Sequence, residues 1–268
     1  MKQNKEAIAK KTLEKLTGKT NMIFQESCRE ATKNLVKKLK QENPGLKKLL
    51  LQEEGGWHTY PKLAAPNNLE LTYLPMKNGK ILLEELKKHN HSILIANSMP
   101  GYAYNEDMQQ LQSTCKENNI IIIDDASASI GTKKPVGDYI VCSLGEHKPL
   151  STGKGGFIAT NNSLELEETK HPSTKYEAII TETKNLAKKL SHWKALKQKL
   201  QEELISKGFK ILNKETGINL LAEYNDEEER ETLINFIKTK KYEYVECPKY
   251  IRTNKKALSI EIKRKKVI

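Results

Sequence analysis

The chain has 268 residues, a formal net charge of +12 and a pI near 9.3. That length can bury a sizeable core in one large or two modest domains. No apolar run approaches membrane-spanning length and the N-terminus is charged rather than apolar, so we expect a soluble cytoplasmic protein with no membrane partner.

The cysteines and the lysines exclude several classes of site. The four cysteines are widely spaced, with no Cys-x-x-Cys and no histidine at zinc spacing, so neither a metal site nor a disulfide framework is indicated. Lysines are spread along the whole chain, which favours solvated helix faces. A nucleic-acid surface would need the charge gathered on one face, so the composition leaves a nucleic-acid partner open without supporting it.

The first half of the chain alternates between helices and strands. Residues 25–41 have helical spacing behind Ser27, a good cap, and strand 92–97 ends at Asn97, where ligands bind in open α/β sheets. Helices are expected at 1–20, 25–41, 82–88 and 105–117, and strands at 49–51, 69–74, 92–97 and 120–125. This alternation predicts a mainly parallel sheet with right-handed crossovers, covered by helices in three layers.

The second half reads differently, as a smaller α+β unit. Residues 161–174 are polar and resemble a linker, and a long amphipathic helix over 183–207 ends at Gly208. Strands are expected at 209–213, 218–223, 242–245 and 257–262, a helix at 226–238, and a solvated basic tail at 263–266. We therefore expect a large α/β domain over residues 1–165 and a small C-terminal domain over 166–268, which begins with the long linking helix.

The most informative stretch runs from Ile120 to Thr160. Four isoleucines form a buried strand that ends in Asp124-Asp125, and Ser143 and Lys148 follow at the next strand end. The carboxyl ends of such strands deliver all three side chains to one edge of the sheet. An acid, a hydroxyl and a lysine together suit pyridoxal phosphate (PLP), because they can pair with the pyridinium nitrogen, hold the phosphate and form the Schiff base.

The same stretch resembles the DegT/StrS sugar aminotransferases, which are fold type I PLP enzymes. Asp124-Asp125-Ala126 stands for the first part of their pattern, and Gly137-Asp138, Ser143, Lys148 and Gly153-Lys154-Gly155-Gly156 match the second without a gap. The resemblance implies Asp125 as the pyridinium partner, Ser143 as a phosphate ligand and Lys148 as the Schiff-base lysine. Ala128 departs from the family, which has a glutamine there.

The resemblance also implies residues outside this stretch. Ser27-Cys28-Arg29 aligns with the turn that holds the cofactor phosphate at a helix N-terminus, although the family's glycine is missing. Trp57, after Gly55-Gly56, aligns with the aromatic residue that stacks on the pyridine ring; the other interpretation is a core or interface aromatic. A two-fold homodimer is implied, with the loops at Trp57 and at Gly153–Gly156 close to the partner.

Three functions fit these observations. The first is an aminotransferase that acts on a small-molecule amino donor and a keto acceptor, possibly a sugar. The second is a PLP-fold binding or regulatory protein, favoured by the short chain, Ala128 and the altered turn at Ser27-Cys28-Arg29. The third is a PLP-dependent lyase or transferase that acts on an aminoacyl-tRNA-like substrate, favoured by the His147-Lys148 pair and the positive charge.

Overall fold

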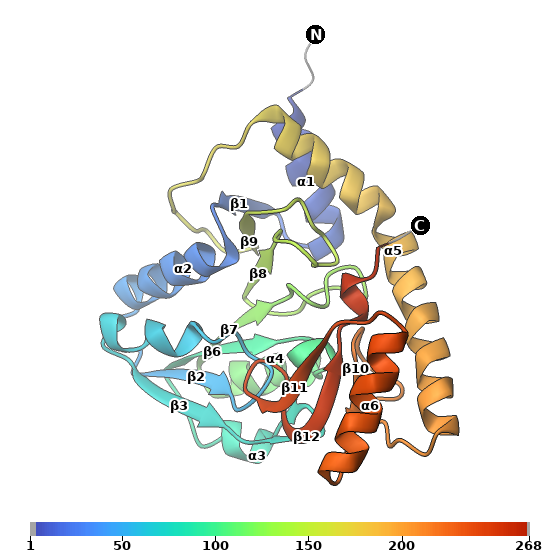
Figure 1. Ribbon diagram of the computed structural model, residues 1–268. Helices are drawn as coiled ribbons and strands as arrows, with labels where there is room; N and C mark the ends of the chain where they lie inside the picture. The colour runs from blue at the N-terminus through green and yellow to red at the C-terminus, as the bar shows by residue number, and fades with distance from the viewer. Residues whose placement is uncertain (1–3, 267–268) are drawn as a thin grey trace.

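The computed structural model describes residues 4–266. Its centre is a seven-stranded mixed sheet with the strand order β1-β9-β8-β7-β6-β2-β3 (Figure 1). The strands are β1 (Asn21–Gln25), β2 (Lys48–Gln52), β3 (Glu70–Leu74), β6 (Ser92–Asn97), β7 (Ile120–Asp125), β8 (Tyr139–Ser143) and β9 (Gly156–Thr160). From β8 to β3 all neighbours pair in parallel, whereas β9 runs antiparallel to both β8 and β1. The mainly parallel sheet predicted from the sequence is confirmed.

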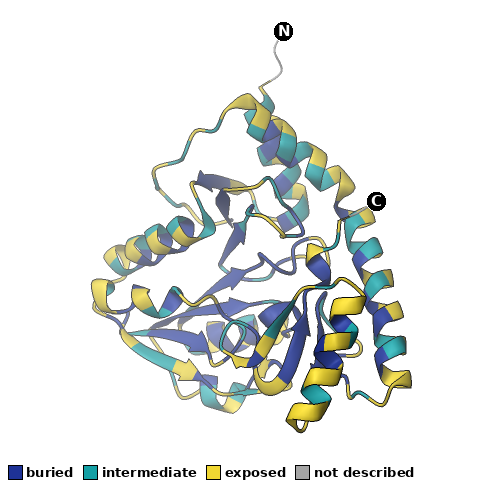
Figure 2. Cartoon of the chain, in the orientation of Figure 1, coloured by how far each residue is buried: buried dark blue, intermediate teal, exposed yellow. Residues whose placement is uncertain are grey.

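Helices cover both faces of this sheet and bury most of its residues, except on the edge strand β3, which stays partly exposed (Figure 2). The helix α2 (Cys28–Glu42) packs its apolar stripe on one face, against Leu49, Ile93 and Ile123 among others. The other face is covered by α1 (Lys5–Thr17), α3 (Leu83–Leu86), α4 (Met108–Glu117) and the first turns of α5 (Ser173–Ser206). The result is the three-layer arrangement expected for strands that are apolar on both faces.

A second, smaller sheet has the order β10-β12-β11 and is antiparallel throughout. Its strands are β10 (Leu220–Glu223), β11 (Tyr244–Lys249) and β12 (Thr253–Ile260). The helix α6 (Glu227–Thr239), capped by Asp226, and the second half of α5 pack against it around a shared apolar cluster. The short strands β4 (Met76–Lys77) and β5 (Lys80–Ile81) form a separate hairpin at the predicted Asn78-Gly79 turn.

Several boundaries differ from the sequence prediction. The helix α5 begins at Ser173, directly after Pro172, rather than at 183, because Tyr176 and Ile179 pack on α1 and extend the apolar stripe. Residues 209–213 form no strand; Ile211 makes only an isolated bridge to Ala222. The edge strand β1 was not predicted, because its five residues, Asn21–Gln25, contain only the short apolar run Met22-Ile23-Phe24.

The solvated tail predicted for residues 263–266 is wrong for Lys263, whereas Arg264 is exposed as predicted. Ile262–Arg264 forms a short 3-10 helix, η4, and Lys263 is buried because its ammonium group pairs with Glu261 at 2.8 Å. Four basic residues in a row look like a solvated segment, but the buried carboxylate of Glu261 binds the first of them, Lys263. Among residues 4–266, no helix has the length and apolar character needed to span a membrane.

Candidate active site

A cavity of about 560 Å³ lies at the carboxyl ends of β6, β7 and β8, between the large sheet and the hairpin β11–β12. Its volume is in the range of pockets that enclose small organic ligands. All seven residues singled out from the sequence line it: Ser27, Cys28, Trp57, Asn97, Asp125, Ser143 and Lys148. Segments distant in sequence are therefore brought together where a parallel sheet is expected to bind its ligand.

Asp125 is the buried acid of the cavity. Its Oδ2 accepts hydrogen bonds from the Tyr60 hydroxyl (2.5 Å) and the Asn97 amide (2.8 Å), and its Oδ1 accepts from the Ser127 backbone N–H (3.0 Å). An ionised carboxylate offers about four acceptor positions, so one on Oδ1 stays open. Asn97 Oδ1 is also buried and has no partner among the described residues. Asp125 and Asn97 both line the cavity, and each therefore has acceptor capacity that no described residue uses.

Lys148 enters the cavity from the loop after β8 and is half-buried. Its Nζ donates a hydrogen bond of 2.5 Å to the hydroxyl of Tyr102, a buried residue on the 3-10 helix η3 (Pro100–Tyr102). Burial acts to lower the pKa of Lys148, but Tyr102 and Asp125 outweigh it, so the pKa is raised. Burial raises the pKa of Tyr102. At neutral pH the pair is therefore an ammonium bound to a neutral phenol.

The N-terminus of α2 forms the opposite wall. Ser27 Oγ accepts from the Glu30 backbone N–H at 3.1 Å, so its hydroxyl caps the helix as predicted. The helix start lies against β9: a Cβ on Gly156 would come within 2.4 Å of the Cys28 backbone nitrogen, so only glycine fits there. Burial, reinforced by Asp125, raises the pKa of the Cys28 thiol to about 12, which makes it unreactive.

Two serines connect these walls. The Ser127 hydroxyl accepts from the Ser143 backbone N–H at 2.8 Å and faces the Cys28 sulfur at 3.7 Å. Ser143 Oγ is half-buried and accepts from the Gly145 backbone N–H at 3.2 Å. Ser127 was not singled out from the sequence, although it follows Asp125 by two residues.

Trp57 lies at the rim of the cavity rather than inside it. Its side chain is 42% exposed and packs on the ring of His58, with 4.3 Å between the ring centroids. Tyr60, three residues later, is the aromatic residue that reaches the buried acid. The contact of Tyr60 with Asp125 was not predicted, because the short 3-10 helix at Tyr60–Leu63 that turns Tyr60 inward has no clear sequence pattern.

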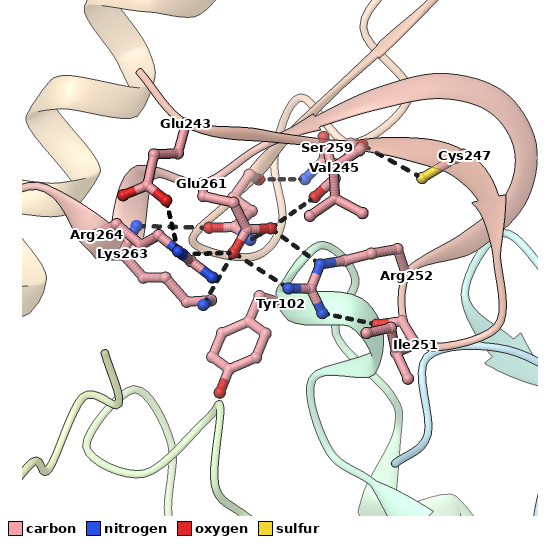
Figure 3. Close-up of polar contacts among 12 residues, drawn as sticks. Tyr102, Glu243, Val245, Cys247, Ile251, Arg252, Ser259, Glu261, Lys263 and Arg264 are labelled. Atoms are coloured by element: carbon pink, nitrogen blue, oxygen red, sulfur yellow. Dashed lines mark hydrogen bonds and ion pairs between the residues drawn. The ribbon is translucent and has the colours of Figure 1, made fainter. Parts of the chain in front are cut away.

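The hairpin β11–β12 and the 3-10 helix η4 add a cationic wall (Figure 3). Arg252 makes a two-point ion pair with the buried Glu261, at 2.9 and 3.1 Å, and Lys263 binds the same carboxylate at 2.8 Å. Burial would raise the pKa of Glu261, but these two cations lower it. Two buried cations face one buried carboxylate, so the cluster carries a net positive charge beside the cavity.

Arginine usage is the signal that would have found this wall. The chain has only four arginines in a strongly lysine-rich sequence: Arg29, Arg230, Arg252 and Arg264. Three of the four line the cavity. Arginine is favoured over lysine where a planar fork must bind a carboxylate or phosphate, so its rarity elsewhere marks these positions.

The comparison with protein families identifies the central part of this site. Residues 84–202 match the model of the DegT/DnrJ/EryC1/StrS aminotransferase family, over a segment that carries Asn97, Asp125, Ser143 and Lys148. That segment is similar in sequence to the DegT/DnrJ/EryC1/StrS aminotransferases. The resemblance drawn from residues 124–156 is confirmed, and PLP is the cofactor of these enzymes. No curated protein sequence matches the chain significantly.

Solved structures share the fold over almost the whole chain. A NifS-like protein superposes with a TM-score of 0.73 at 17% identity, covering 96% of this chain and 81% of that one. A DegT/DnrJ/EryC1/StrS aminotransferase from Brucella abortus gives 0.73 at 13% identity, covering 97% and 86%. A GDP-4-keto-6-deoxy-D-mannose-3-dehydratase from E. coli with bound hydrated PLP gives 0.73 at 13% identity, covering 97% and 88%. The fold is that of the PLP-dependent type I enzymes.

The residues of the cavity fit PLP. The open position on Asp125 and the unpartnered Asn97 Oδ1 suit a pyridinium N–H, which needs a buried acceptor. The backbone amides at the start of α2 and the nearby Arg29 suit a phosphate dianion. Lys148 supplies the amine in the same cavity. The pyridine nitrogen, the phosphate and the aldehyde of the cofactor therefore each have a matching partner in the cavity.

Proposed function

We propose that this protein is a PLP-dependent aminotransferase that moves an amino group from a small-molecule donor to a keto acceptor. The observation that carries the proposal is the convergence of Asp125 and Lys148 on one cavity, within a segment that matches an aminotransferase family. Bound PLP supplies an electrophilic carbon and an electron-withdrawing ring for amino-group transfer.

Each residue has a distinct task in this proposal. Asp125, fixed by Tyr60, Asn97 and Ser127, holds a proton on the pyridine nitrogen by charge pairing in a buried site. Lys148 binds the cofactor and, once freed, is the base that moves a proton within the cavity. The α2 amides at Ser27 and Cys28, together with Ser143, hold the phosphate. Trp57 lies at the rim of the cavity, and the resemblance implies that it stacks on the cofactor ring.

The cationic wall supports an anionic substrate. Arg252 and Lys263 carry one more positive charge than Glu261 neutralises, and Arg264 lies on the same side of the cavity. A donor with a carboxylate, or an acceptor with a phosphate such as a nucleotide-linked keto sugar, would offset this excess charge. The E. coli GDP-4-keto-6-deoxy-D-mannose-3-dehydratase has a similar fold, so a keto sugar is a suitable acceptor to test.

The proposal includes assembly and location. Trp57 and Tyr73, on the rim loop and on the edge strand β3, are exposed by 42% and 45%, which suits burial against a second copy in a two-fold homodimer. Lys154, in the glycine loop before β9, is our candidate for reaching the partner's site. All four cysteines are free, which fits a reducing cytoplasm.

The experiment that tests the function combines cofactor binding with chemistry. Protein with added PLP should gain a visible absorption band, and borohydride reduction should leave the pyridoxyl group on the peptide that contains Lys148. Lys148→Ala should lose both, whereas Lys133→Ala, an exposed lysine outside the cavity, should keep both. Pyridoxyl label on another lysine would refute the assignment. PLP binding without transfer from any amino donor would favour a binding or regulatory role instead.

A further inference from the structure

Tyr102 has an unusual backbone conformation. Its φ is +63°, in the left-handed region that a bulky residue other than glycine rarely adopts, and Gly101 beside it has a φ of +61°. Such a conformation costs on the order of 1–3 kcal/mol and persists only where the surroundings enforce it. A residue kept under strain next to a ligand cavity is a sign of function.

The enforcing contacts come from the C-terminal part of the chain. The Tyr102 carbonyl accepts hydrogen bonds from the backbone N–H groups of both Ile218 (2.8 Å) and Asn219 (2.9 Å). Gly101 lies so close to Arg252 that a Cβ would come within 2.5 Å of the Arg252 carbonyl oxygen. The backbone of Tyr102 is therefore fixed by the segment before β10 and by the hairpin β11–β12.

Cations surround the ring that this backbone positions. Lys263 Nζ lies 4.7 Å from the ring centroid, Lys148 Nζ 5.1 Å and the Arg252 guanidinium carbon 5.7 Å, all within cation–π range. Figure 3 shows the ring below the cluster of Arg252, Glu261 and Lys263, with its hydroxyl pointing away from them. That hydroxyl accepts the hydrogen bond from Lys148.

We propose that Tyr102 is a positioning residue for Lys148. Its hydroxyl holds the lysine ammonium group in the cavity and stabilises the charged form of the amine. Its ring lies within cation–π range of Lys148, Arg252 and Lys263, and so connects the lysine with these two cations. The role of Lys148 itself rests on the proposed function. The contact between Tyr102 and Lys148 belongs to the protein without cofactor, so it can be measured independently of PLP.

Other groups act on the charge of Lys148, and the test must separate Tyr102 from them. They are Asp125 on β7, Cys28 on α2, Cys142 on β8 and Lys263 on η4. None of them is altered by replacing Tyr102 with phenylalanine, which removes one oxygen and keeps the ring within cation–π range of Arg252 and Lys263. A change in the Tyr102→Phe variant therefore reports on the hydroxyl.

The experiment follows carbamylation of cofactor-free protein by cyanate, a reagent small enough to enter the cavity, and measures the modified peptides by mass spectrometry across a pH series. Only the neutral amine reacts, so the midpoint of the rate gives the pKa of each lysine. A hydrogen bond to an ammonium is lost in Tyr102→Phe, so the Lys148 midpoint should fall by about one to two pH units. The midpoint of Lys197, a buried lysine bound to backbone carbonyls elsewhere, should stay unchanged.

Two further variants complete the design. Tyr104→Phe, at a buried tyrosine that does not line the cavity, should leave the Lys148 midpoint at its wild-type value. Tyr102→Asn suits the left-handed backbone and also removes the hydroxyl, so it should lower the midpoint even if the phenylalanine variant fails to fold. An unchanged Lys148 midpoint in the folded Tyr102 variants would overturn the proposal. If the Lys148 midpoint falls in the Tyr102 variants but the protein binds no PLP, the role of Tyr102 is supported and only the proposed function is refuted.

Discussion

Asp124 and Asp125 are neighbours in sequence with opposite surroundings. Successive side chains of a strand point to opposite faces of the sheet, so only one of the two can reach the cavity. Asp125 Oδ2 meets Tyr60 and Asn97 at the cavity wall, whereas Asp124 accepts from the Val136 backbone N–H at 3.0 Å on the other side. The two acids can therefore be separated by matched substitutions.

Replacing Asp125 should abolish most of the activity. Asp125→Asn removes the charge that holds a proton on the pyridine nitrogen and replaces one of the two acceptor oxygens by an NH2 group, which cannot accept from Tyr60, Asn97 or Ser127. We expect a loss of turnover on the order of 100-fold or more, as for loss of one preorganised electrostatic partner. Asp124→Asn is the control and should keep turnover near wild type. Steady-state turnover of both variants with one amino donor measures the difference. Equal losses in the two variants would contradict the assignment of Asp125 as the partner of the pyridine nitrogen.

Lys263 offers a test of the cationic wall without breaking the ion pair between Arg252 and Glu261. Lys263→Met leaves that pair neutral and removes the excess positive charge. We expect KM for a carboxylate-bearing donor to rise about tenfold, the loss of one charged contact, with kcat little changed. Lys255→Met, an exposed lysine on β12 outside the cavity, is the matched control. An unchanged KM for every anionic donor would exclude this wall from substrate binding.

The sequence predicted those site residues that follow strand ends. Asn97, Asp125 and Ser143 each end a buried strand, so topology alone brings them to one edge. Tyr102, Arg252 and Lys263 were missed because their positions depend on how the small sheet packs against the large one, and no local pattern encodes that packing. The interpretation of 263–266 as a solvated tail failed at Lys263 for the same reason.

The strand β7 carries a buried acid, Asp124, that makes the free energy of unfolding depend on pH. Burial raises the pKa of Asp124 to about 7, and Oδ1 of this carboxyl has no partner among the described residues. The folded state therefore keeps a proton that the unfolded chain loses near pH 4. This contribution to stability is fully present at low pH and disappears as pH rises through about 7. Glu106, which precedes α4, behaves in the same way, with a pKa also raised to about 7 by burial.

We expect the free energy of unfolding to fall by a few kcal/mol between pH 5 and pH 7.5, on the order of what such pKa shifts imply. Asp124→Asn has no proton to lose and should reduce that fall, and the additional change Glu106→Gln should reduce it further. Urea unfolding at several pH values measures both. A fall as steep in the double variant as in the wild type would show that other groups cause it.

Helices and strands with a clear apolar period were predicted well, and exceptions have physical causes. The capped helix α2 and the apolar strands β6 and β7 match the expected ranges within a few residues. The strand β1 is stabilised by antiparallel pairing with β9, in which Asn21 lies opposite Thr160 and Gln25 opposite Gly156. Because this partner is far away in sequence, no local pattern predicts the strand. The first turns of α5 are fixed by contact with α1, which a local reading of polar residues cannot anticipate.

For the whole molecule we expect a two-fold homodimer. Light scattering at micromolar concentration should give twice the mass of the 30.6 kDa chain, with an interface on the order of 2,000 Å² or more. Trp57→Ser should weaken the dimer because it removes a large exposed aromatic side chain, and Ile205→Ser, exposed on α5, is the control. A strict monomer that binds PLP tightly would show that one chain completes the site alone.

The helix α5 runs along one side of the molecule from α1 to the small sheet, and it has a mechanical consequence (Figure 1). Its 34 residues contain neither glycine nor proline, so it is a continuous rod of about 50 Å with no built-in hinge. Tyr176 and Ile179 attach one end to α1, while Trp193 and Leu200 attach the other to the small sheet. Because the helix is continuous, the rotational position of Trp193 and Leu200 about the helix axis is set by that of Tyr176 and Ile179. One residue inserted near Lys184 would turn the second attachment by about 100° relative to the first, and the hairpin that carries Arg252 would lose its register with the cavity.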